Sequence, residues 1–260
     1  PGQFVGEDRP IAEAHAGEQR ALSLMPPMRR QVDQIAGVQG CGKSLCVKYI
    51  AREWRLPLLK LEAGRLYDKY VGESEKNFRK AITSAESLAP VVLWIDELEK
   101  ALAGSANSEA DGGLSRRLLG FFLTWLQEKR QDVFVAATAN DVWSLPPELL
   151  RKGRFDEIFF VDLPRAAERT EIFRLHLRLR KQDPNRFDLQ RLTEASEGFS
   201  GAEIEQALVA ALYRALYEKK TLDTLLILRE IEGTVPLSIS RREDIERLRR
   251  TAEGRFVKAS

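Results

Sequence analysis

One short motif constrains the fold of this chain more than any other feature. Residues 37–44, GVQGCGKS, fit the pattern G-x-x-x-x-G-K-[ST] of phosphate-binding loops. Such a loop follows a buried β-strand and opens a helix, so that backbone N–H groups and the helix N-terminus surround the phosphate. Lys43 is expected to reach the β- and γ-phosphates, and the Ser44 hydroxyl is expected to bind Mg²⁺. The other loop residues expected to contact a nucleotide are Gly37, Gly40, Cys41, Gly42 and Leu45.

The residues before this loop do not resemble the strand that it requires. The segment 31–36, QVDQIA, is half polar and contains no apolar run. A central strand here would place Asp33 and Gln34 in the core, where polar groups without partners are costly. We therefore predict that residues are absent between about Gln34 and Gly37, which makes 1–36 a partial or discontinuous N-terminal flanking segment.

After residue 36, short apolar runs alternate with longer segments of helical spacing. The expected strands are 56–61, 91–95, 133–137 and 158–161, and the expected helices between them are 44–54, 74–88 and 114–128. This order predicts an α/β domain over 37–163, with a parallel sheet covered by helices on both faces. Strand signals stop after Asp162, so we predict a small all-helical domain over 164–236, with helices near 165–179, 189–195 and 201–217. A C-terminal tail of charged helix or loop, 237–260, follows.

Composition excludes several classes of partner. The 41 basic and 39 acidic side chains leave a net charge of +2, which gives no reason to expect nucleic acid or an anionic membrane surface. No apolar run is long enough to span a membrane. Two cysteines cannot form a disulfide framework, and reduced thiols suit a cytoplasmic protein. His15 and His176 have no companions at metal-binding spacing, so no zinc site is expected.

A second motif adds acidic residues at the end of a predicted strand. The apolar run 91–95 is followed by Asp96 and Glu97. Asp96 is expected in the Mg²⁺ shell, and Glu97 is expected to polarise an attacking water, although a solvated helix start would also explain two acids. The next strand ends at Asn140, which can hydrogen-bond the water or the γ-phosphate if its strand lies beside the phosphate-loop strand.

Together with LLRKGRFD at 149–156, these motifs resemble the AAA clade of AAA+ ATPases over about residues 37–236. The runs WIDE (94–97), PPELLRKGRFDEIFF (146–160) and GFSGAEIEQA (198–207) are most similar to the Ycf46-like proteins of cyanobacteria and plastids. The resemblance implies a P-loop NTPase fold with a helical lid, and ATP and Mg²⁺ as ligands. It also implies a homo-oligomeric ring, expected to be a hexamer, that hydrolyses ATP to remodel or thread a protein partner.

The resemblance assigns further residues. Arg151 and Arg154 match the arginines that reach the γ-phosphate bound by the neighbouring subunit. The alternative is an arginine-rich turn that pairs with Glu148 or Asp156. In the lid, Gly201 and Ala202 match residues near the adenine base, although capping of the helix by Ser200 explains the same sequence.

A loop after the second predicted strand matches the substrate-gripping loop of the family. Its residues are Lys69, Tyr70, Val71 and Gly72, and the alternative is a helix start capped by Ser74. Residues 104–113 are a candidate second pore segment.

The competing function is a nucleotide-dependent assembly switch or adaptor with little turnover, and a nucleic-acid translocase is a third hypothesis. The expected location is the cytoplasm, or the stroma in a plastid-bearing organism.

Overall fold

A computed structural model describes residues 32–62, 71–102, 114–129, 131–149, 151 and 154–259. Within these residues the α/β domain is built on a six-stranded sheet with the order β2-β3-β4-β1-β5-β6. Every pairing is parallel, as strands joined by crossover connections require. The strands are β1 Val32–Gly37, β2 Leu58–Glu62, β3 Val91–Asp96, β4 Val133–Ala139, β5 Glu157–Val161 and β6 Val257–Lys258.

Strand β1 runs without interruption into the phosphate loop, so the predicted break before Gly37 is wrong. It pairs with β4 on one side and with β5 on the other, which places Gln34 opposite Ala137 and Ile158. Asp33 and Gln34 are both fully buried. The strand therefore begins inside the segment that was expected to lie outside the domain.

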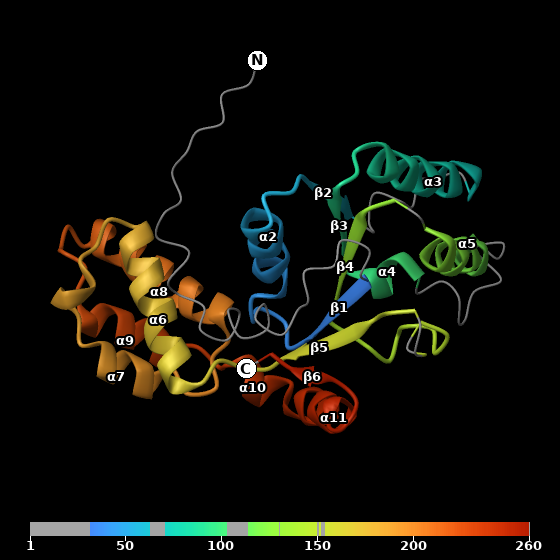
Figure 1. The fold of residues 1–260 in the computed structure, drawn as a ribbon. Coiled ribbons are helices and arrows are strands. Elements are labelled where there is room, and N and C mark those ends of the chain that lie inside the picture. Colours follow the sequence, from blue (N-terminus) through green and yellow to red (C-terminus); the bar gives the residue numbers. More distant parts are fainter. Residues whose placement is uncertain are drawn as a thin grey trace, which may run out of the picture.

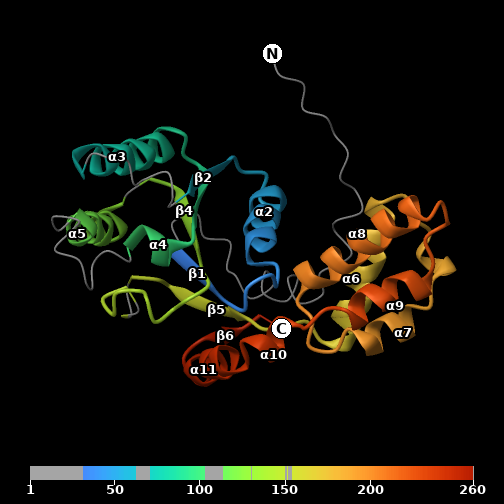
Figure 2. The same ribbon diagram turned by 180° about the vertical axis from the view of Figure 1, so that it is seen from behind.

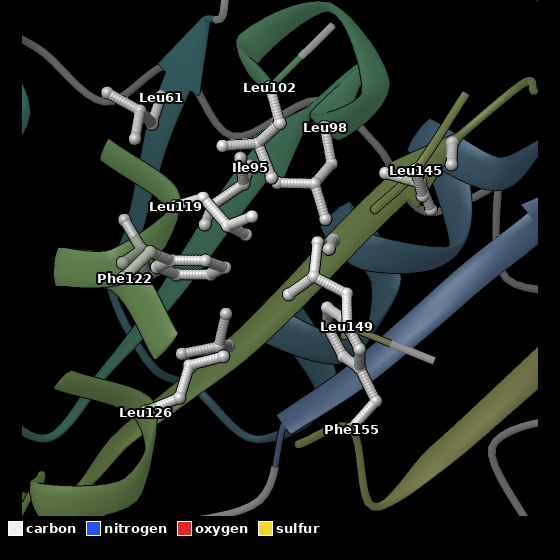
Figure 3. Packing of buried hydrophobic residues seen from close by; sticks show 14 of the residues in the cluster. Leu61, Ile95, Leu98, Leu102, Leu119, Phe122, Leu126, Leu145, Leu149 and Phe155 are labelled. Carbon is white, nitrogen blue, oxygen red and sulfur yellow. The ribbon is translucent and has the colours of Figure 1, made fainter. Parts of the chain in front are cut away.

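Helices cover both faces of the sheet, as predicted (Figures 1 and 2). On one face, α2 (Lys43–Glu53) packs Val47 and Ile50 against Ile35 and Phe134 of the strands. On the other face lie α3 (Val71–Ser87), α4 (Leu98–Leu102) and α5 (Leu114–Glu128). Figure 3 shows the core beneath α5. The helix contributes to this core apolar residues at three- and four-residue spacing. Those residues are Leu118, Leu119, Phe122, Trp125 and Leu126.

The predicted helical domain, called the lid below, contains α6 (Ala166–Leu179), a 3₁₀ turn (Pro184–Arg186), α7 (Leu189–Ala195), α8 (Gly201–Tyr217) and α9 (Thr224–Glu232). It has its own core around Phe173 and Leu208. Asp188, Ser200 and Asp223 cap α7, α8 and α9, each accepting a hydrogen bond from the backbone N–H three residues later. No helix in the described part of the chain has the length and apolarity needed to cross a bilayer.

The C-terminal tail differs from the expected helix or loop because it also adds a strand. After α10 (Leu237–Ser240) and α11 (Arg242–Ala252), β6 joins the sheet beside β5, and the Ala259 N–H donates to the Phe160 carbonyl at 3.0 Å. Arg249 forms an ion pair with Asp162 at 2.9 Å, and the Arg247 guanidinium lies 4.5 Å from the centroid of the Trp143 ring. Figure 1 shows α11 beside β5 and β6, so the tail returns from the lid to the α/β domain.

Candidate functional site

A cavity of about 420 Å³ lies between the carboxyl edge of the sheet and the lid. Figures 1 and 2 show α2 next to α6 and α8 at this place. The volume is that of a small-molecule site, and the carboxyl edge of a parallel sheet is where such sites form. The predicted site residues that line the cavity are Gly40, Cys41, Gly42, Lys43, Ser44, Leu45, Asp96, Glu97, Asn140, Gly201 and Ala202.

Glycines give the phosphate loop its shape. Gly37, Gly40 and Gly42 have φ angles of 144°, 77° and 91°, which other residues rarely adopt. A Cβ atom on Gly37 would lie 2.0 Å from the Val161 carbonyl oxygen. Gly37 does not line the cavity. A glycine is needed at this position because β1 and β5 approach each other closely there. At Gly40 the loop meets the lid, because the Ala202 N–H donates to the Gly40 carbonyl at 3.0 Å.

Lys43 begins α2 and turns back over the loop. Its Nζ atom donates to the carbonyl oxygens of Gly37 and Val38 at 2.8 and 2.9 Å. Burial lowers the pKa of this ammonium to about 8. A bound phosphate would favour the charged form of the Lys43 ammonium, because an adjacent negative charge offsets the effect of burial. Burial raises the pKa of the neighbouring Cys41 thiol to about 12, which keeps it protonated.

Acidic and amide side chains meet at the ends of β3 and β4. The Glu97 carboxylate pairs with Lys100 at 2.8 Å and accepts a hydrogen bond of 3.5 Å from Asn140 Nδ2. Glu97 has a φ angle of 54°, a conformation that costs free energy for a residue with a side chain and is typical of functional sites. Sequence reasoning missed Glu99, which is buried and accepts a hydrogen bond from the Asn140 N–H at 3.0 Å. Burial raises the pKa of Glu99.

The donor atoms at this edge suit Mg²⁺. Ser44 and Asp96 both line the cavity, and their hydroxyl and carboxylate oxygens are the hard ligands that Mg²⁺ prefers. Nowhere in the described residues do three or more His, Cys, Asp or Glu side chains gather as a metal-binding group.

The far end of the cavity is formed by the lid. Gly201 and Ala202 line this end of the cavity, and Ser200 caps α8. The predicted contact of Gly201 and Ala202 with an adenine base stays a prediction. Sequence reasoning missed Ile172 and His176 of α6, which also line the cavity. Their four-residue spacing puts them on one helix face and is the signal that could have identified them. Burial is the main cause that lowers the pKa of His176.

The two predicted arginine fingers do not line this cavity. Arg151 is exposed, and Arg154 donates a hydrogen bond of 3.0 Å to the carbonyl oxygen of Leu123, a residue of α5. Their predicted action on a neighbouring subunit stays a prediction. Of the predicted substrate loop, Lys69 and Tyr70 fall outside the described residues, as does the segment 104–113. Val71 and Gly72 belong to the first turn of α3, and Ser74 follows inside that helix.

Known proteins resemble this chain in sequence and in fold. The profile of the ATPase family associated with various cellular activities (AAA) matches residues 34–163. The AAA domain-containing protein ycf46 of Guillardia theta is 48% identical over 215 residues, which cover 82% of this chain and 42% of that protein. The cell division cycle protein 48 homolog of Archaeoglobus fulgidus is 35% identical over 188 residues, or 72% of this chain and 25% of that protein.

The FIGL-1 AAA domain has the same fold, with a TM-score of 0.72 at 19% identity, over 92% of this chain and 82% of that structure. These likenesses confirm the predicted resemblance and the predicted fold. The chain spans less than half the length of the ycf46 protein that it matches, 42% in the case of Guillardia theta.

Proposed function

Because this chain belongs to the AAA family of ATPases, we propose that it binds ATP with Mg²⁺ in the cavity and hydrolyses it. The observation that carries this proposal is the convergence of the phosphate loop with Asp96, Glu97 and Asn140 on one cavity. These groups come from separate segments of the chain, and each suits a different part of phosphoryl transfer.

Each side chain has a distinct role in this proposal. Lys43 and the loop N–H groups would hold the phosphates, and the lid residues Ile172 and Ala202 would surround the base. Ser44 and Asp96 would hold Mg²⁺, which when bound neutralises charge on the β- and γ-phosphates. Glu97 would accept the proton of the attacking water, and Asn140, which hydrogen-bonds Glu97, would keep the carboxylate and the water aligned.

The site of a single subunit is incomplete in this proposal. Arg151 and Arg154 would act on the ATP of a neighbouring subunit in a ring of identical chains, which we take to be hexameric. In support, Arg151 is exposed and lines no part of its own cavity. The ring would use hydrolysis to remodel or thread a protein, gripped by Lys69, Tyr70, Val71 and Gly72. We place this activity in the cytoplasm, or in the plastid stroma where the organism has one.

Two variants test the hydrolytic roles. Glu97→Gln removes the general base and should lower steady-state ATPase activity by about 100-fold or more. Arg151→Ala should lower it by roughly 1,000-fold at saturating ATP, because the finger stabilises charge in the transition state. Binding of a fluorescent ATP analogue should survive in both. Glu53→Gln, at an exposed position on α2, is the matched control and should turn over like the parent. Parental turnover in Glu97→Gln and Arg151→Ala would refute the assigned roles.

A further inference from the structure

Both oxygens of the Asp96 carboxylate have partners that the proposed reaction does not use. Oδ1 accepts a hydrogen bond from Thr138 Oγ1 at 2.7 Å. Oδ2 forms an ion pair with Lys60 Nζ at 3.0 Å. Thr138 Oγ1 in turn accepts a hydrogen bond from Trp94 Nε1 at 3.2 Å. Adjacent strands β2, β3 and β4 thus each contribute one side chain to the surroundings of Asp96.

The direction of this hydrogen-bond chain is determined by chemistry. The Trp94 indole N–H can only donate, so the Thr138 hydroxyl accepts from it and directs its own hydrogen to Asp96. Trp94 and Thr138 are 3% and 2% exposed, so water competes little for these bonds. Oδ1 is therefore oriented by the protein, and Oδ2 is left as the oxygen that faces a cation.

In this structure the cation at Oδ2 is Lys60. Its ammonium lies 4.6 Å from the centroid of the Trp94 ring, whose electron-rich face attracts positive charge. It also pairs with Glu62 at 3.1 Å, which gives it a second carboxylate to remain with when it leaves Asp96. The Lys60 side chain is 36% exposed and its four-carbon stem is flexible. The ammonium can therefore shift between the two carboxylates.

We propose that Trp94 and Thr138 are positioning residues that aim Asp96 at the metal, and that Lys60 and Mg²⁺ compete for Asp96 Oδ2. This inference rests on the proposed binding of Mg²⁺-ATP. In this proposal Lys60 keeps the carboxylate paired while no divalent cation is bound, and its ammonium would stay with Glu62 alone when Asp96 holds Mg²⁺. Hydrogen bonds to the ligands of a metal commonly set its affinity in this way.

The test measures the metal without measuring turnover. The Kd of a fluorescent, non-hydrolysable ATP analogue is determined with excess Mg²⁺ and again with EDTA. The ratio of the Kd in EDTA to the Kd in Mg²⁺ reports how much Mg²⁺ tightens binding. Thr138→Val, which removes the hydroxyl at nearly constant volume, should reduce this ratio by about tenfold or more through the Mg²⁺ arm. Thr138→Ser should restore it, and Trp94→Phe, which removes only the N–H donor, should reduce it less.

Lys60→Met gives the opposite prediction, because it removes the competing cation and keeps the stem. The tightening by Mg²⁺ should increase. Thr193→Val is the matched control: it removes a buried hydroxyl that lies 2.8 Å from Thr170 in the lid, and it should leave the ratio unchanged. Thermal unfolding of each variant shows whether it is folded, and Trp94→Phe carries the test of the hydrogen-bond chain if Thr138→Val does not fold.

The outcomes separate this inference from the function on which it rests. A parent protein that binds no nucleotide in either condition would refute the proposed function. A parent that binds with Mg²⁺ tightening, together with Thr138 variants that shift both Kd values equally, would refute the positioning role alone. Weaker tightening in Lys60→Met would show that Lys60 assists the metal, and would overturn the competition.

Discussion

Strands β1 and β3 occupy equivalent places in the molecule but differ in sequence. Each lies beside β4 in the sheet, is buried on both faces and delivers a site motif from its carboxyl end. In β3 all residues from Val91 to Ile95 are apolar, whereas β1 buries Asp33 and Gln34. Position in the sheet therefore decides whether a residue is buried, and the residue type decides the free-energy cost of that burial.

The cost differs between the two strands. Burial of an apolar side chain in β3 stabilises the fold, whereas neither amide atom of Gln34 has a hydrogen-bond partner among the described residues. A buried polar group in that state costs about 1–3 kcal/mol. Strand β1 is stabilised in spite of this by parallel pairing on both sides, which satisfies its backbone.

The largest expected effect is at the end of β1. Gly37→Ala would place a Cβ atom 2.0 Å from the Val161 carbonyl oxygen at a φ angle of 144°, so β1 and β5 would have to separate. We expect urea unfolding to show a loss of more than about 4 kcal/mol. Gly120→Ala is the control, because nothing lies within 4 Å of its added Cβ in α5. Equal stability of the two variants would contradict the tight contact.

A smaller loss is expected in β3. Ile95 is fully buried in the core beneath α5, so Ile95→Ala would leave a cavity and should lower the free energy of unfolding by about 2–5 kcal/mol. Leu58→Ala, at the exposed start of β2, should cost far less in the same urea titration. A loss at Ile95 no greater than at Leu58 would mean that β3 owes little to its apolar sequence.

The smallest expected effect has the opposite sign and returns to β1. Gln34→Met keeps the shape of the side chain and removes the amide, so the free energy of unfolding should rise by about 1–3 kcal/mol. Gln190→Met, on the exposed surface of α7, should change it by less than about 0.5 kcal/mol. Destabilisation by Gln34→Met in urea would show that the amide makes a hydrogen bond in solution.

Local pattern was sufficient for much of the molecule. Helix α5 has the predicted bounds, residues 114–128, because its apolar spacing is regular over four turns. The roles of the phosphate loop, Asp96, Glu97 and Asn140 toward a nucleotide stay predictions, but these residues were all singled out from the sequence, since each motif lies in one short segment and follows a recognisable strand. Glu99, Thr138 and His176 were not, because their partners come from other segments of the chain.

Short sequence patterns were sufficient to predict the family, the parallel sheet and a phosphate loop that lines one end of the cavity. These depend on backbone geometry over a few residues, which glycines, apolar runs and helical spacing specify directly. Only the tertiary structure decided that β1 is a continuous central strand, that β6 returns to the sheet, and that Trp94, Thr138 and Lys60 surround Asp96. The physical reason is that burial and hydrogen-bond partners belong to neighbours in space, and a polar strand is tolerated in the core when strands on both sides pair its backbone.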